Sequence, residues 1–148
     1  MYIREYGKEN DKTLLFFPGS CEPWQEFAYA AEALAGEYHI LLVVPDGQDP
    51  EEGTDFLSVE KTADDAAAWL KAHGIKHLDA LYGLSYGGGM ATRFLVSQKI
   101  FVRRAIIALV RTFIWVKTAN EITGSITLSS SWPLSLAKVM HMSLPMTL

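Results

Sequence analysis

Short apolar runs alternate with segments of helical spacing along the first two thirds of this chain. Four runs are typical of buried strands: residues 13–17 (TLLFF), 38–44 (YHILLVV), 78–82 (LDALY) and 103–107. Three segments between them repeat apolar residues at helical spacing: 25–34, 59–73 and 87–96. Such alternation predicts parallel strands joined by right-handed helical crossovers. The predicted fold class is therefore α/β, a short and mostly parallel sheet flanked by helices.

The edges of these segments and the composition refine the prediction. Gly36 and Gly74 follow two of the helical segments as stops, and Tyr2–Tyr6 adds a candidate edge strand with weak alternation. The 148 residues are 49% hydrophobic and 20% charged, which is a globular composition. A net charge of −4 without a basic block argues against nucleic-acid binding.

Three features bear on the compartment. Cys21 is the single cysteine, so no internal disulfide can form. The N-terminus is charged and has no apolar signal core. The longest apolar stretch, residues 100–116, contains three arginines, which argues against a membrane span. We therefore expect a cytoplasmic protein without a membrane span.

The segment Gly83-Leu84-Ser85-Tyr86-Gly87 carries the most specific chemical signal. It matches the pattern G-x-S-x-G, with an apolar run before it and a helical pattern after it, which is the setting of a nucleophile elbow. Side chains two residues before and after the serine would collide with so tight a turn, so glycine is expected at 83 and 87. The alternative is an ordinary glycine-rich turn between a strand and a helix.

Phosphate-binding loops fit the same segment poorly. The Walker pattern needs Gly-Lys-Ser/Thr, and Gly89-Met90 does not supply it. The dinucleotide pattern G-x-G-x-x-G is also out of register here.

No metal-ligand spacing stands out among the histidines, because Gly74 interrupts the helix between His73 and His77. We therefore expect neither a cofactor nor a metal.

Residues 13–107 resemble the first part of the α/β-hydrolase superfamily of serine esterases and lipases. The resemblance rests on the run 13–17 leading into Pro18-Gly19-Ser20, the run 38–44 ending in Pro45-Asp46, and the elbow at Ser85. It implies that Ser85 attacks a carboxylic ester or similar small acyl substrate. The N–H of Ser20 or of Cys21, together with the N–H of Tyr86, would then form the oxyanion hole.

The catalytic partners do not follow the family pattern. That pattern places the acid and then the histidine after the serine, but His39, His73 and His77 all precede Ser85. Only Glu121 and His141 follow it, so they are candidate triad partners by order alone. Asp46 ends a strand at the site-forming edge, where capping of the loop is favoured over contact with substrate.

The last part of the chain differs from the first in its hydrophobic pattern and in its content of acidic residues. Residues 108–148 have no clear period, and all but one of the 17 carboxylates precede them. We therefore divide the chain into residues 1–107, the first part of a hydrolase-like domain, and residues 108–148, an atypical segment that packs on it or is loosely ordered. A truncated or frame-shifted product would have this appearance.

This division leaves two structural outcomes and three functions open. The strand near residue 107 would present an uncovered edge. Either a helix over residues 110–119 covers this edge, or the chain self-associates through it. The chain is an active serine hydrolase, an inactive remnant of one, or a module that binds a small acyl ligand or a partner chain in the same pocket.

Overall fold

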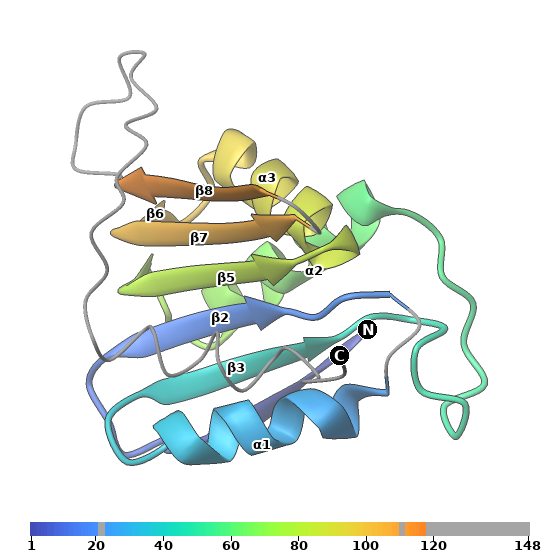
Figure 1. The fold of residues 1–148 in the computed structure, drawn as a ribbon, viewed down its shortest axis with the longest axis horizontal. Helices are drawn as coiled ribbons and strands as arrows, with labels where there is room; N and C mark the ends of the chain where they lie inside the picture. The colour runs from blue at the N-terminus through green and yellow to red at the C-terminus, as the bar shows by residue number, and fades with distance from the viewer. Residues whose placement is uncertain (21–22, 110–111, 118–148) are drawn as a thin grey trace.

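A six-stranded sheet forms the centre of the molecule, in the order β1-β3-β2-β5-β7-β8 (Figure 1). The computed structural model describes residues 1–20, 23–109 and 112–117. The four inner strands are parallel: β2 (Thr13–Phe17), β3 (His39–Val44), β5 (Ala80–Leu84) and β7 (Arg104–Leu109). The two outer strands, β1 (Tyr2–Tyr6) and β8 (Thr112–Lys117), run antiparallel to their neighbours. The predicted α/β fold and the predicted edge strand at Tyr2–Tyr6 are thus confirmed.

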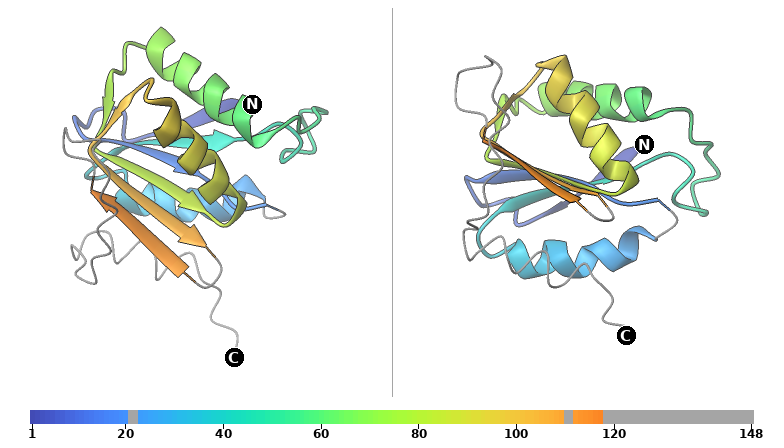
Figure 2. Two further views of the ribbon diagram at one scale, coloured as in Figure 1. Left: turned by 90° about the horizontal axis from the view of Figure 1, so that it is seen from above. Right: turned by 45° about the horizontal axis from the view of Figure 1, so that its top comes forward.

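Three helices cover the sheet, as the periodicity predicted. Helix α1 (Trp24–Leu34) lies on one face, and α2 (Val59–Ala72) and α3 (Tyr86–Ser97) lie on the other (Figure 2). Helix α2 begins where the Ser58 hydroxyl accepts the N–H of Lys61, and it ends before Gly74, whose φ is +73°. Among the helices that the structure describes, none is both long enough and apolar enough to cross a bilayer.

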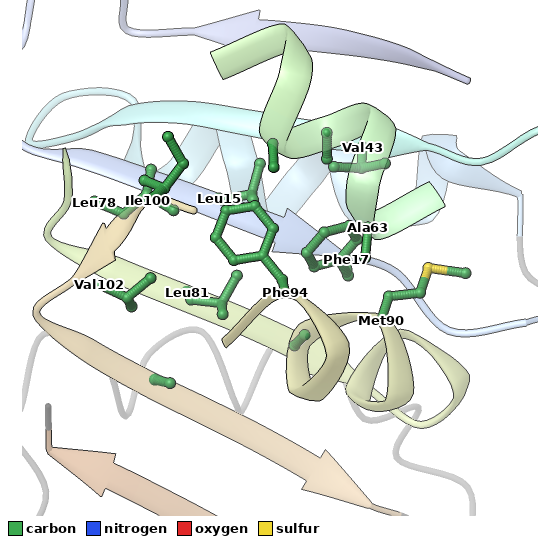
Figure 3. Packing of buried hydrophobic residues seen from close by; sticks show 14 of the residues in the cluster. Leu15, Phe17, Val43, Ala63, Leu78, Leu81, Met90, Phe94, Ile100 and Val102 are labelled. Carbon is green, nitrogen blue, oxygen red and sulfur yellow. The ribbon is translucent and has the colours of Figure 1, made fainter. Parts of the chain in front are cut away.

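The inner strands are apolar on both faces because helices cover both. One core lies between the sheet and α2 and α3 (Figure 3), where Leu15, Phe17, Leu81, Met90 and Phe94 are fully buried. The other lies under α1 and contains the side chains of alternate strand positions: Leu14, Phe16, Ile40, Leu42 and Tyr82. This double burial explains why the strands read as continuous apolar runs in the sequence.

The predicted strand at 78–82 is divided in the structure. Its first part, β4 (His77–Leu78), pairs with β6 (Phe101–Val102) in a separate two-stranded sheet. Asp79 separates β4 from β5, because its main-chain N–H donates to the Thr13 carbonyl and its carboxylate accepts the Thr13 N–H. These two bonds place the start of β5 beside the start of β2.

Residues 112–117 correct one expectation. We considered a helix over 110–119, but this segment forms β8, which pairs with β7 with Ala108 opposite Phe113. Its sequence, TFIWVK, is dominated by β-branched and aromatic residues, which favour a strand. Pairing also satisfies the outer N–H and C=O groups of β7. The edge that we expected to be open is therefore occupied, and the rest of residues 108–148 lies outside the described part of the chain.

Candidate active site

The carboxyl ends of the inner strands bring the sequence-predicted loops to one edge of the sheet. Strands β2 and β5 are adjacent and parallel, with Phe17 opposite Gly83. Ser20 follows β2 by a few residues, and Ser85 directly follows β5. This edge lies at the right of the sheet in Figure 1, where α3 also begins. Ligand sites of open α/β sheets form at such an edge.

Ser85 occupies a strained backbone conformation between β5 and α3. Its φ of 50° and ψ of −115° lie where residues with side chains are rarely found. Such a conformation costs about 1–3 kcal/mol and persists only where the surroundings enforce it. Two hydrogen bonds contribute here: the Ser85 N–H donates to the Ala108 carbonyl at 2.6 Å, and the Ser85 carbonyl accepts the N–H of Gly88 at 2.9 Å. The turn is therefore attached to both β7 and α3.

The Ser85 side chain is half-buried and does not cap the helix that follows it. A serine before a helix commonly caps it through its hydroxyl, yet Ser85 makes no such bond to α3. The first turn of α3 directs its positive dipole end toward this position.

Gly83 and Gly87 leave no room for a side chain. A Cβ at Gly83 would lie 2.6 Å from both the Ala91 Cβ and the Gly87 carbonyl oxygen. A Cβ at Gly87 would collide with the carbonyl oxygens of Phe17 and Pro18. The glycines thus let the start of α3 rest against β5 and against the end of β2. This contact holds the loop after β2 next to the elbow.

Two of the main-chain N–H groups at this edge are the expected oxyanion donors, and neither has an acceptor among the described residues. One belongs to Ser20, which is exposed, and the other to Tyr86, the first residue of α3. The first N–H groups of any helix lack an intrahelical partner. Cys21, the alternative to Ser20, lies outside the described residues. The segment before Ser20 is buried at Pro18 and Gly19, and the Gly19 carbonyl accepts a bond from Gln48 Nε2 at 2.9 Å.

Apolar side chains border the elbow. The Tyr86 ring meets the Phe56 ring edge-on, with 5.5 Å between centroids. Tyr86 is 40% exposed, and the neighbouring Leu57 is 68% exposed. The loop between β3 and α2 therefore brings apolar surface to the start of α3.

The described histidines lie in elements other than the elbow. His39 on β3 lies 2.9 Å from the Glu5 carboxylate on β1. His73 stacks on Trp69 at the end of α2, and its ring contacts the Trp69 carbonyl. His77 is in β4, at the amino end of the sheet. Glu121 and His141 lie outside the described residues.

Carboxylates near the same edge hold the loop after β3. Asp46 pairs with the N-terminal ammonium at 2.5 Å, and this hydrogen bond lowers the pKa of Asp46. Asp49 is buried and accepts a hydrogen bond from the Tyr2 hydroxyl, which lowers the pKa of Asp49, while burial raises the pKa of Tyr2. The predicted capping of the loop by Asp46 stays a prediction, because the ion pair of Asp46 is with the N-terminal ammonium. Across residues 1–20, 23–109 and 112–117, no cluster of side chains suited to a metal ion is found.

Gln48 makes a contact that was not predicted from the sequence. It lies in the polar loop after the second inner strand, and no motif distinguishes it from its neighbours there. Its contact with the Gly19 carbonyl joins two loops that are 29 residues apart. Only the fold brings these loops together, so the sequence contains no local signal for the contact.

Comparison with family models and with curated proteins finds no match for this sequence. Solved structures do match. A putative alpha/beta hydrolase family protein from Desulfitobacterium hafniense has a TM-score of 0.65 at 24% identity, over 70% of this chain and 42% of its own. The esterase EaEST from Exiguobacterium antarcticum has a TM-score of 0.58 at 19% identity, and the match covers 70% of this chain and 39% of the esterase. The RedJ thioesterase from Streptomyces coelicolor has a TM-score of 0.58 at 21% identity, and the match covers 67% of this chain and 39% of the thioesterase.

These similarities establish an α/β-hydrolase fold. The chain spans about two fifths of the length of these structures. It therefore corresponds to only part of their fold, and the chemistry has to be argued from the site itself.

Proposed function

We propose that Ser85 is the nucleophile of a serine hydrolase site that acts on carboxylic esters or similar acyl compounds. One observation carries the proposal: a serine with φ 50° and ψ −115° links a buried parallel strand to a helix, between two glycines that admit no Cβ. This is the geometry of a nucleophile elbow. A turn that served only to connect β5 and α3 would have no need of a strained serine, because glycine adopts these angles at less cost.

In the proposed reaction, Ser85 Oγ attacks the acyl carbon and the carbonyl oxygen acquires negative charge. The N–H groups of Ser20 and Tyr86 donate to that oxygen, and each such donor is worth about 3 kcal/mol of barrier. The C–O bond to the alcohol then breaks, and water hydrolyses the acyl-serine. The Ser85 hydroxyl proton passes to a base, which gives it to the oxygen of the leaving alcohol. We propose His141 as this base, with Glu121 as the acid that orients it. Their order along the chain supports these two roles.

The apolar surface beside Ser85 favours substrates with an apolar group. Tyr86, Phe56 and Leu57 would contact either the acyl chain or the alcohol of an ester. The nearby carboxylates Asp46 and Asp49 already have partners in the protein. We therefore propose uncharged or anionic small acyl substrates rather than cationic ones.

The positions of the described histidines favour a second candidate, a site that binds an acyl ligand without turning it over. His39 contacts Glu5 on β1, His73 stacks on Trp69 of its own helix, and His77 lies in β4, so none of the three is seen to contact Ser85. In this case the same elbow would hold a ligand or a partner through its N–H groups, as an inactive remnant of a hydrolase or as a binding module.

Labelling by a fluorophosphonate separates the candidates. The probe forms a bond between Ser85 Oγ and phosphorus as fluoride leaves, and mass spectrometry locates the adduct. We expect labelling of the Ser85 peptide, loss of the label in Ser85→Ala, and no loss in Ser58→Ala, a serine that caps α2. A folded protein that is labelled no faster than Ser85→Ala would contradict the hydrolase. Stabilisation by a non-hydrolysed acyl ligand would then support the binding module.

A further inference from the structure

A hydrogen bond from one side chain fixes the peptide group that carries a proposed oxyanion donor. Gln48 Nε2 donates to the Gly19 carbonyl at 2.9 Å. The Gly19 C=O and the Ser20 N–H belong to the same peptide unit, which is planar and trans, so the two groups point in opposite directions. An anchor on the carbonyl therefore determines the direction in which the Ser20 N–H points.

The base of the Gln48 side chain is itself held firmly. The Gln48 N–H donates to the Pro45 carbonyl, which closes a four-residue turn directly after β3. Gly47, the third residue of that turn, has a φ of +78°, which glycine adopts readily. The next residue, Asp49, is buried against the Tyr2 hydroxyl. Gln48 thus projects from a fixed turn and not from a free loop.

The surroundings of the Gln48 amide oxygen determine which amide atom faces the Gly19 carbonyl. Its Oε1 is buried and has no hydrogen-bond partner among the described residues. A buried oxygen of this kind is destabilising when it has no donor. A reversed amide would place that oxygen against the Gly19 carbonyl oxygen, so the nitrogen must face Gly19. The contact with Gly19 is thus the polar interaction that this side chain makes.

We propose that Gln48 is a positioning residue for the oxyanion hole, which it serves by holding the Gly19–Ser20 peptide in the donating orientation. This inference rests on the proposed function, in which the Ser20 N–H is an oxyanion donor. Gln48 acts through that peptide and does not touch the substrate.

The substitution Gln48→Met tests the proposal, since it keeps the length of the side chain and removes the donor. Gln48→Glu is a second variant, which replaces the donor by an oxygen. Gln25→Ala, an exposed glutamine of α1, is the matched control. Loss of a whole oxyanion donor slows reaction by about 100- to 1,000-fold, so a misdirected one is expected to slow fluorophosphonate labelling of Ser85 by roughly tenfold. The effect should fall on the maximal labelling rate and not on the probe concentration for half-maximal rate.

A second measurement reads the peptide without any chemistry. In ¹H–¹⁵N spectra, the Ser20 amide should shift in Gln48→Met and Gln48→Glu, and stay in place in Gln25→Ala. Unchanged labelling and an unchanged Ser20 amide in folded variants would overturn the inference while the proposed function stands. If the wild type is not labelled at all, the proposed function fails, and with it the catalytic role of Gln48. The Ser20 amide then still decides whether Gln48 holds this peptide.

Discussion

The carboxyl and amino ends of the strands in the central sheet differ in the contacts that join neighbouring elements. At the carboxyl end, main-chain groups approach one another so closely that Gly83 and Gly87 admit no side chain, and Ser85 adopts strained angles. At the amino end, the charged residues Lys12, Asp79, Arg103 and Arg104 line a cavity of about 310 Å³ together with Tyr38 and Ala80. There a side chain adds to the main-chain bonds between strands, because the Asp79 carboxylate accepts the Thr13 N–H.

The difference teaches where this fold concentrates its strain. Contacts at the amino end involve flexible, partly exposed side chains, which can adjust when one of them is changed. Contacts at the carboxyl end involve backbone atoms, which cannot move without displacing a strand or a helix. A strained serine needs the second kind of surroundings, because its conformation persists only where neighbours enforce it.

The largest effect is expected for Gly87→Ala at the carboxyl end. The new methyl group would meet the carbonyl oxygens of Phe17 and Pro18, so α3 must move away from β2. We expect a loss of about 3 kcal/mol or more in the free energy of unfolding, which urea denaturation measures.

Gly89→Ala is the matched control in the same helix. Its new methyl group would have only the Val59 side chain nearby, at 3.8 Å, which is an ordinary contact. Alanine is the better helix former, so this variant should gain up to about 1 kcal/mol. Equal stability of the two variants would show that the start of α3 is not packed against β2 as described.

An intermediate effect is expected for Asp79→Ala at the amino end. The substitution removes the carboxylate that accepts the Thr13 N–H, and Thr13 is buried. An unsatisfied buried N–H costs about 1–3 kcal/mol, which thermal or urea unfolding would detect. Arg103→Ala removes only the exposed partner of Asp79, at 3.5 Å, and should cost less than about 1 kcal/mol. If the arginine matters more than the aspartate, then charge pairing and not the main-chain contact joins the strands here.

The smallest effect concerns pH and returns to the carboxyl end. The N-terminal ammonium lowers the pKa of Asp46 below its ordinary value of 3.8. A lowered pKa gives stability that is present above the unfolded value and is lost as the pH falls through the folded value. Wild-type stability should therefore fall more steeply below about pH 4 than that of Asp46→Asn. Identical slopes for the two proteins would show that the ion pair of Asp46 with the N-terminal ammonium does not contribute to stability.

The inner strands and the three helices could be predicted from sequence because their pattern is local. The runs at 13–17 and 38–44 are apolar on both faces, and the stripe with Phe27 and Leu34 repeats at helical spacing. The steric need for glycine at 83 and 87 also followed from the motif, although the atoms that they approach, such as the Phe17 carbonyl, come from a distant strand.

Other parts depend on contacts that the local sequence does not encode. Residues 112–117 form β8 because they pair with the edge of β7. The helix that we expected there would have left that edge unpaired. The division at Asp79 depends on Thr13, which is 66 residues away. Gln48 has no motif, so its contact with Gly19 was not foreseen. The roles of Ser85, Ser20, Tyr86, Glu121 and His141 stay predictions until chemistry tests them.

The strain at residue 85 can be measured directly by comparing Ser85→Gly with Ser85→Ala in urea denaturation. In ordinary helical or extended backbone, alanine is more stable than glycine by about 0.5–1 kcal/mol. At φ 50° and ψ −115° the order should reverse, with glycine the more stable by about 1 kcal/mol or more. An alanine variant that equals or exceeds the glycine variant in stability would contradict the strained turn on which the proposed nucleophile depends.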